Sequence, residues 1–92
     1  KLAALIISSK DESLADDLAR LIAASAPFSL DLQVLGPAPA PIAVLRGRHR
    51  RRFLLKGSKS INMQKIIKVW LQNIRIPSKA KLEIDIDPYN FM

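Results

Sequence analysis

The sequence predicts an α+β fold in which two helices cover one face of a four-stranded antiparallel sheet. Three observations predict it: one continuous apolar segment, two amphipathic helix patterns, and stretches in which apolar and polar residues alternate. Their order is strand, helix, strand, strand, helix, strand, which is the split βαβ or ferredoxin-like arrangement. A chain of 92 residues is long enough for one such domain and too short for two.

The first strand is predicted at residues 2–7, where six consecutive apolar residues precede Ser8 and Ser9. Such a run is typical of a strand that is buried on both faces in the interior of its sheet. Because the two helices cover only one face, the pattern also predicts that something outside this chain partly covers the other face.

The first helix is predicted to begin with a capping box of Ser9 and Glu12 and to end near Ala26, before Pro27. Its apolar stripe consists of Leu14, Leu18, Leu21 and Ile22. The first two turns are acidic and carry Asp11, Glu12, Asp16 and Asp17. The positive end of the helix dipole favours carboxylates there, so we interpret them as helix stabilisers and not as a catalytic pair.

The middle of the chain contains two predicted strands separated by a Pro-rich segment. Residues 28–35 alternate between apolar and polar, as in a half-buried strand. Residues 36–41 lack an N–H donor at alternate positions and are predicted to form a stiff extended loop. Residues 45–57 form the next strand, and its alternation puts two sets of side chains on opposite faces. One set is Arg48, Arg50, Arg52, Leu54 and Lys56, and the other is His49, Arg51, Phe53 and Leu55.

The second helix is predicted to be capped by Ser58 and to end at Pro77. Its apolar face consists of Met63, Ile66, Ile67, Trp70, Leu71 and Ile74. The last strand is predicted at residues 81–87, where strict alternation separates an apolar face from a charged face before Pro88 closes the strand. The apolar face consists of Leu82, Ile84 and Ile86.

Positive charge is concentrated in one part of the sequence. Lys and Arg number 15 against 8 Asp and Glu, giving a net charge of +7. Twelve of these basic residues lie in residues 46–81, which contain no acidic residue. A block of one sign raises a local potential that mixed charges would cancel, so the sequence favours a polyanion-binding surface over a solvated face. The hydrophobic content of 49% indicates a folded domain and not a disordered basic tail.

The composition offers little for catalysis or metal binding. There is no Cys, which excludes thiol catalysis, thiolate zinc sites and disulfides. There is also no Gly-rich phosphate loop. The only histidine, His49, lies among five arginines, so a structural or DNA-facing role is favoured over that of a base. Asp85 and Asp87 are expected to be solvent-facing charges and not metal ligands. Acylphosphatases share this fold, but their phosphate cradle follows the first strand, where this chain is acidic. No catalytic residue is predicted.

The predicted binding site is the Arg-rich segment. Arg46 and Arg48 flank Gly47, so the backbone could approach a phosphate while both guanidiniums reach its oxygens. The predicted DNA contacts are Arg46, Gly47, Arg48, His49, Arg50, Arg51, Arg52 and Lys56. Further basic residues would widen this site if the fold brings them to the same side; they are Lys65, Lys68, Arg75, Lys79 and Lys81. Aromatic residues for base stacking are scarce, which favours phosphate-dominated binding with little sequence specificity.

Three segments carry a family resemblance: the Pro-rich loop with its flanks at 35–42, the Arg-Gly-Arg segment at 45–50, and residues 84–91. On these residues the chain resembles the C-terminal domain of PriA, the bacterial primosomal protein N′, over essentially its whole length. The resemblance implies that residues 1–92 are one C-terminal domain of a larger protein, as the start at Lys1 without an initiator Met also suggests. That parent would be an ATP-dependent 3′–5′ DNA helicase of superfamily 2 that remodels stalled replication forks and initiates primosome assembly.

The resemblance also implies cofactors and partners. The parent would bind ATP, Mg and Zn outside this chain. It would act in the bacterial cytoplasm, and no membrane would be among its partners. Its partners would be branched or single-stranded DNA, the rest of PriA, other primosome proteins and the single-stranded DNA-binding protein. The acidic tail of that last protein would dock on a basic residue and a Gln, matched here by Lys59 (or Ser60) and Gln64. The family usually has an aromatic at position 49 and often at 51, where this chain has His49 and Arg51, so charge would replace stacking.

Three functions remain open from the sequence. The first is a DNA-binding accessory domain that uses the Arg-rich segment. The second is a docking module for the acidic tail, and the third is an independent RNA-binding protein of the ribosomal protein S10 type, which the fold class and the charge fit equally well.

Overall fold

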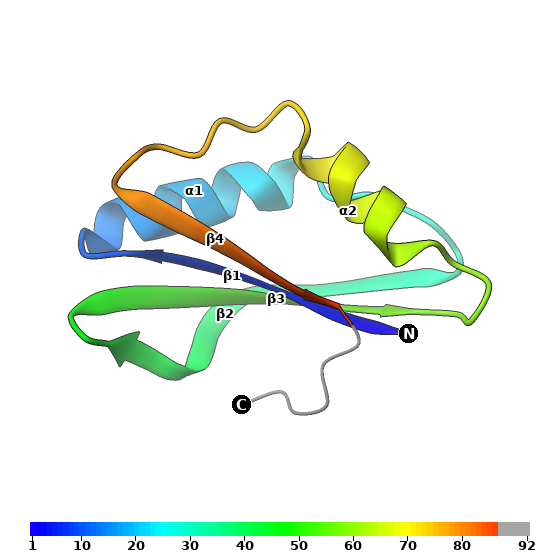
Figure 1. The fold of residues 1–92 in the computed structure, drawn as a ribbon, viewed down its shortest axis with the longest axis horizontal. Helices are drawn as coiled ribbons and strands as arrows, with labels where there is room; N and C mark the ends of the chain where they lie inside the picture. Colours follow the sequence, from blue (N-terminus) through cyan, green and yellow to red (C-terminus); the bar gives the residue numbers. More distant parts are fainter. Residues whose placement is uncertain (87–92) are drawn as a thin grey trace.

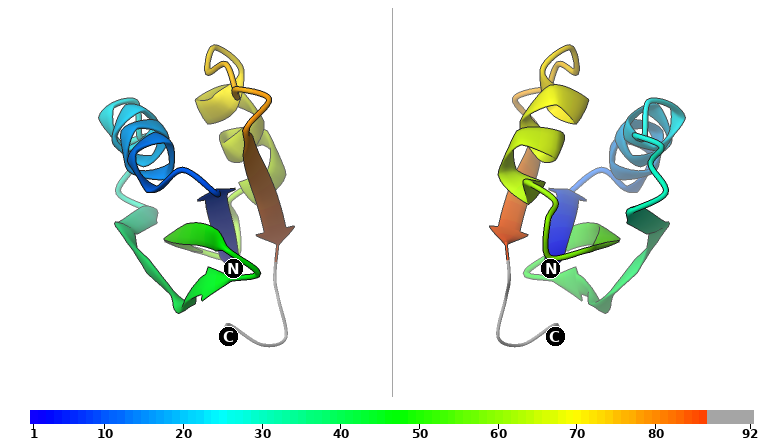
Figure 2. Two further views of the ribbon diagram at one scale, coloured as in Figure 1. Left: turned by 90° about the vertical axis from the view of Figure 1, so that its left-hand side faces the viewer. Right: turned by 90° about the vertical axis from the view of Figure 1, so that its right-hand side faces the viewer.

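The computed structural model of the chain describes residues 1–86 and has the predicted α+β architecture (Figure 1). Its strands are β1 (Leu2–Ser9), β2 (Leu32–Leu45), β3 (Arg48–Gly57) and β4 (Ala80–Ile86). They form one four-stranded sheet in the order β2-β3-β1-β4, and every pairing is antiparallel. The helices α1 (Glu12–Ala24) and α2 (Met63–Leu71) lie on the same side of the sheet (Figure 2). This is the ferredoxin-like arrangement that the order of elements predicts.

The core lies between the sheet and the two helices. The helix-facing side chains of β1 are fully buried at Ala3, Leu5 and Ile7. Phe53 packs edge-on against Trp70, with ring centroids 5.5 Å apart and planes at 83°. The indole N–H of Trp70 donates a buried hydrogen bond of 2.9 Å to the carbonyl oxygen of Ile22 in α1. Both rings are therefore part of the core and are unavailable for base stacking.

The opposite, open face of β1 is also largely covered. Ala4 and Ser8 are buried on this face, and Ile6 is half-buried. Ser8 is covered by Arg48 of β3, whose guanidinium donates to the Ser8 hydroxyl at 3.2 Å and to its carbonyl oxygen at 3.0 Å. The sequence predicts a cover from outside this chain, but part of the burial of this face comes from Arg48 of β3 itself.

Helix α1 begins differently from the prediction. Its N-cap is Asp11, whose carboxylate accepts the N–H of Leu14 at 3.3 Å. Ser9, the predicted cap, instead ends β1, where its buried hydroxyl accepts the N–H of Asp11 at 3.1 Å and donates to the Lys79 carbonyl oxygen at 3.0 Å. The helix ends at Ala24, and Leu21 is 55% exposed. The buried face is narrower than the predicted stripe and consists of Ala15, Leu18, Ala19 and Ile22.

Helix α2 is shorter than predicted at both ends. Its N-cap is Asn62, whose side chain accepts the N–H of Lys65 at 3.1 Å. Ser58 is not the cap; its N–H donates to the carbonyl oxygen of Asp31 at 3.1 Å and ties the β3–α2 connection to the chain before β2. The helix ends at Leu71, before the predicted end at Pro77.

The boundaries of β2 also differ from the prediction. Phe28 and Leu30, assigned to a strand from their alternation, are 92% and 95% exposed and precede the sheet. The Pro-rich segment is extended as predicted but belongs to β2, and its pairing with β3 is interrupted on both sides of the pairs Ala38–Arg52 and Pro39–Arg51. Proline is tolerated here because β2 is an edge strand, whose outer side needs no N–H donors.

The start of the predicted 45–57 strand is a tight turn. Leu45 pairs with Arg48, and the two residues between them, Arg46 and Gly47, have φ angles of 53° and 77°. Positive φ at both positions is what a type I′ hairpin turn requires. In β4 the apolar residues face the helices as predicted, while Asp87 and Pro88 lie outside the described residues. None of the helices in residues 1–86 is long and apolar enough to cross a membrane.

Candidate nucleic-acid interface

The Arg-rich strand β3 sends its side chains alternately to the two faces of the sheet, as its alternation predicts. Arg50 pairs with Ser8 and therefore lies on the open face, whereas His49 pairs with Ser9 and lies on the helix-facing side. The eight predicted DNA contacts are thus split between two faces. Arg48, Arg50, Arg52 and Lys56 are on the open face, His49 and Arg51 are on the helix face, and Arg46 and Gly47 form the turn.

The side chain of Arg51 is hydrogen-bonded to helix α1. Its Nε donates to Asp16 at 2.8 Å and its Nη2 to Glu12 at 3.2 Å, and its side chain is only 13% exposed. The hydrogen bond to Asp16 is the largest cause that raises the pKa of the Arg51 guanidinium above its ordinary value, and Glu12 adds to it against the opposing effect of burial. The acidic first turns of α1 therefore hold the helix on the sheet. This role goes beyond the stabilisation of the helix by its dipole that the sequence predicts.

His49, which also belongs to β3, lies near helix α1. Its Nδ1 is 3.5 Å from the Glu12 carboxylate, too far for a normal hydrogen bond, and has no hydrogen-bond partner in the described structure. Its position on the helix face separates it from the arginines of the open face. The structure therefore does not bring His49 and Arg51 together with the rest of the predicted contact set.

Two arginines of the open face are held by the chain itself. Arg48 donates to Ser8 through Nε and Nη2, and Arg50 donates through Nη1 to the carbonyl oxygen of Ile42 at 3.0 Å. A guanidinium has five N–H donors, so these bonds orient each group and leave donors for a ligand. At the adjacent turn, Gly47 is exposed and a Cβ there would meet no atom within 4 Å, so the backbone can be approached.

The strand register shows where the positive charge of the open face lies. Lys81 of β4, Ser8 of β1 and Arg50 of β3 form one row across the sheet. The next two rows carry carboxylates on β4, because Glu83 pairs with Ile6 and Asp85 pairs with Ala4. Positive charge is therefore greatest at one end of the sheet, where β1 ends and β3 and β4 begin. We call the residues Arg46, Arg48, Arg50 and Lys81 the basic end.

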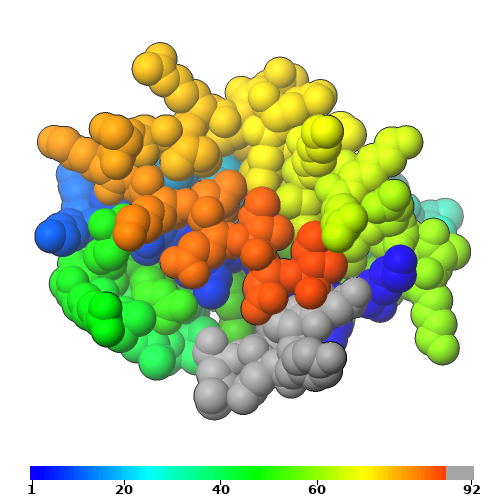
Figure 3. Space-filling model, viewed as in Figure 1, coloured from blue at the N-terminus to red at the C-terminus, as the bar shows by residue number. Residues whose placement is uncertain are grey.

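The basic end lies at the left of the molecule in Figure 1, and in Figure 3 the β1–α1 turn (blue), the β2–β3 turn (green) and the start of β4 (orange) meet there. Lys79 and Lys10 line a pocket with two members of the basic end, Arg48 and Lys81. Lys10 was missed by sequence reasoning, although its position directly after β1 places it beside the start of the antiparallel neighbour β3. Lys65 and Lys68 lie on α2 instead, on the opposite side of the sheet.

Of the two residues predicted to dock an acidic tail, Gln64 lines the groove between α2 and β4, and Lys59 is not part of its lining. Lys59 is exposed in the connection before α2, and Gln64 is exposed on α2. Gln64 lines a groove of about 440 Å³ between α2 and β4, and the basic residue in that groove is Lys68. The remaining lining is Ile67, Leu71, Gln72, Ile84 and Ile86.

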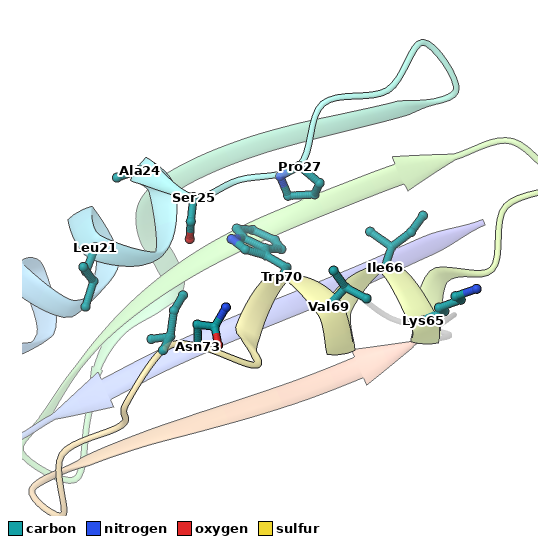
Figure 4. Close-up of a pocket in the computed structure, with 10 residues that line it drawn as sticks. Leu21, Ala24, Ser25, Pro27, Lys65, Ile66, Val69, Trp70 and Asn73 are labelled. Carbon is teal, nitrogen blue, oxygen red and sulfur yellow. The ribbon is translucent and has the colours of Figure 1, made fainter.

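A larger groove of about 680 Å³ lies between the two helices (Figure 4). Leu21 lines it from α1, and Val69 and Trp70 line it from α2. Among the described residues of its lining, Lys65 is the only charged side chain. Within the described part of the chain, no pair of titratable groups lines this groove. Across residues 1–86, no three His, Asp or Glu side chains are placed to hold a metal ion, and Asp87, the predicted neighbour of Asp85, lies outside that range.

Comparison with known proteins identifies the family. The family model described as primosomal protein N C-terminal domain matches residues 1–89. The chain is 43% identical over 91 residues to the replication restart protein PriA of Rickettsia prowazekii and 41% identical to that of Rickettsia felis, covering 99% of this chain in both cases. It is 30% identical over 96 residues to the PriA of Treponema pallidum.

The match covers only part of these relatives, since the chain spans 14% of the length of each of the three. It extends over nearly the whole chain, including the Pro-rich segment and the Arg-rich strand. The resemblance seen in the sequence is thereby confirmed, and the chain belongs to the family of C-terminal domains of the primosomal replication restart protein PriA.

Proposed function

We propose that this chain is a DNA-binding accessory domain of a replication restart helicase and that it contacts DNA phosphates through the basic end of its sheet. The observation that carries the proposal is the row of Arg50, Ser8 and Lys81, extended by Arg48, in which cations of two strands flank the buried end of β1. No acidic side chain of the three strands belongs to this row.

The geometry suits phosphate better than bases. Arg48 and Arg50 are oriented by hydrogen bonds to Ser8 and Ile42, so little side-chain entropy is lost when they bind an oxyanion. The rings of Phe53 and Trp70 are buried, so they cannot stack on bases. Binding of this kind tolerates different sequences and weakens steeply with salt.

The proposal extends to the parent by way of its relatives, which are named as replication restart proteins. The parent is proposed to be an ATP-dependent 3′–5′ helicase whose ATP, Mg²⁺ and Zn²⁺ are bound outside this chain, acting in the cytoplasm on branched or single-stranded DNA with other primosome proteins. The basic end would hold the DNA while other parts of the parent act on it.

The test is the salt dependence of DNA binding by the full chain. Replacing both Arg48 and Arg50 with Ala is expected to reduce the slope of log affinity against log salt by about 0.7 to 0.9 for each phosphate that is no longer neutralised. The matched control is the double change Lys65→Ala and Lys68→Ala, which removes the same charge from α2 and should leave the slope near that of the unchanged chain. An equal reduction of the slope in both variants would show that only net charge matters. An unchanged slope in the arginine variant would place the DNA elsewhere.

The same assay distinguishes the DNA-binding function from the alternative of an RNA-binding protein of the ribosomal protein S10 type. An RNA strand and a DNA strand of the same length and sequence are compared under one salt condition. A phosphate-binding surface at the basic end should bind both within a few fold of each other, and its dependence on Arg48 and Arg50 should be the same. A strong preference for the RNA strand would instead favour RNA as the ligand of this surface.

A second function is supported by the groove between α2 and β4. It combines an apolar lining with Gln64 and Lys68, which suits an acidic peptide that also carries apolar side chains. The acidic tail proposed for the single-stranded DNA-binding protein is the candidate peptide. Titration of a labelled tail peptide should show severalfold weaker binding for Lys68→Glu. The comparison with Lys59→Glu decides the site, because weakening by Lys59→Glu alone would move the peptide to the connection before α2.

A further inference from the structure

A small polar pocket lies at the basic end, shares Arg48 and Lys81 with it, and is lined by four basic side chains. Its volume is about 290 Å³, and its basic residues are Lys10, Arg48, Lys79 and Lys81. They come from four separate places: the β1–α1 turn, the start of β3, the connection before β4, and β4 itself. The pocket exists only because the sheet pairing brings these four segments to one end.

Two residues of the pocket lining, Ser9 and Arg48, are held by hydrogen bonds within the chain. The Ser9 hydroxyl joins the N–H of Asp11 to the carbonyl oxygen of Lys79, at 3.1 and 3.0 Å. Arg48 is bound to Ser8 through two of its nitrogens. The loop that follows β1, the connection before β4 and the guanidinium of Arg48 are therefore held relative to one another before any ligand arrives.

The charges of the pocket are not balanced within the described structure. Asp11 is the only acidic residue of the lining, and its carboxylate already accepts the N–H of Leu14 as the helix cap. The ammonium groups of Lys10, Lys79 and Lys81 have no ion pair or hydrogen bond anywhere in residues 1–86. Four cations against one carboxylate leave the lining with a charge of +3.

We infer that this pocket binds one phosphate group of a polynucleotide and so fixes the position of the strand along the basic end. The inference rests on the proposed DNA-binding function. The remaining N–H groups of Arg48 would donate to two non-bridging phosphate oxygens, and the lysine ammoniums would supply point charges around them. Arg50, outside the pocket, would contact a neighbouring phosphate. The phosphate could be an internal diester or a terminal monoester, which carries more charge.

The experiment uses the full chain labelled with ¹⁵N. It is titrated with inorganic phosphate and then with two short single strands that differ only in a 5′-phosphate or a 5′-hydroxyl. The amide signals of Ser9, Lys79 and Lys81 are expected to shift with phosphate and with both strands. Tighter binding of the 5′-phosphate strand identifies a terminal phosphate as the ligand, and equal binding identifies an internal one. Unchanged signals with phosphate and with both strands would overturn the inference.

A variant makes the conclusion independent of chemical shifts. The double change Lys79→Ala and Lys81→Ala removes two exposed lysines. At 0.1 M salt, strand binding is expected to weaken about fivefold for each of these lysines that neutralises a phosphate. The matched control is Lys65→Ala with Lys68→Ala, and thermal unfolding of both variants checks that they are folded. If strand binding depends on Arg50 but not on Lys79 and Lys81, the pocket is wrong and the DNA-binding function stands. If it depends on none of the three, both fail.

Discussion

Arg51 of β3 and Asp16 of α1 are joined by a hydrogen bond of 2.8 Å between the guanidinium Nε and a carboxylate oxygen. Glu12, one turn earlier on α1, accepts a second bond from the same guanidinium at 3.2 Å. The strand that carries the candidate DNA-binding arginines is thus attached to the first helix through an arginine of its opposite face. Arg51 therefore attaches the strand to α1, whereas its neighbour Arg50 lies on the open face with the candidate DNA contacts.

The first prediction concerns the stability that this attachment provides. Arg51→Met keeps the aliphatic stem but leaves Asp16 and Glu12 without their partner, and it should lower the free energy of unfolding by about 1–2 kcal/mol. Urea unfolding followed by circular dichroism measures the change. A double-mutant cycle with Asp16→Asn should give a coupling energy of at least about 0.5 kcal/mol.

The matched control is Arg50→Met, which makes the same chemical change on the open face. Within residues 1–86, the one hydrogen bond of the Arg50 guanidinium goes to the carbonyl oxygen of Ile42 in the exposed β2 segment, so replacing Arg50 should cost less stability than replacing Arg51. Equal losses for the two variants would show that the contact with α1 adds no specific stability.

The second prediction reverses the ranking of the same two variants for DNA binding. Arg50→Met should weaken binding about fivefold at 0.1 M salt, the effect of leaving one phosphate without its cation. Arg51→Met removes the same charge but should leave the affinity of the folded protein nearly unchanged, because the guanidinium is turned toward α1. Fluorescence anisotropy with a labelled single strand measures both. A larger loss for Arg51→Met would mean that DNA binds on the helix side.

This division between neighbouring arginines shows what the sequence could predict. Strict alternation was sufficient to place Arg50 and Arg51 on opposite faces, because side chains along a strand have a period of two. The partners of Arg51 carry a weaker signal: Glu12 and Asp16 are four residues apart, so they share one face of α1. That signal becomes informative only once α1 is known to cross the start of β3.

Other features depended on tertiary pairing that local patterns do not contain. Phe28 and Leu30 alternate with polar residues like a strand, yet they precede the point where the chain reaches β3. The nearness of Lys10, Lys79 and Arg48 follows from the pairing of β1 with both β3 and β4, which joins residues about 30 to 70 positions apart. Spacing along the sequence cannot show such a cluster.

The third prediction concerns the interruption in β2. Gly36 has a φ of 109°, and a Cβ built there would lie 2.6 Å from the carbonyl oxygen of Arg52 and 3.3 Å from the Cα of Phe53. Gly36→Ala should therefore lower the free energy of unfolding by about 2 kcal/mol or more, from backbone strain and from the clash with β3. Chemical unfolding measures it. Ala38→Gly, at an exposed position two residues along β2, is the control, and its cost should be about 1 kcal/mol or less.

The fourth prediction separates charge from backbone strain at the β2–β3 turn. Arg46 has a φ of 53°, a left-handed conformation that costs a residue with a Cβ about 1 kcal/mol relative to glycine. Arg46→Gly should therefore be more stable to urea than Arg46→Ala by about 1 kcal/mol, although both remove the same charge. If Arg46 contacts a phosphate, both variants should lose the same amount of DNA affinity and salt dependence. Equal stability of the two variants would show that the turn relaxes from its left-handed conformation, and unequal DNA affinity would show that the shape of the turn, and not only its charge, contributes to binding.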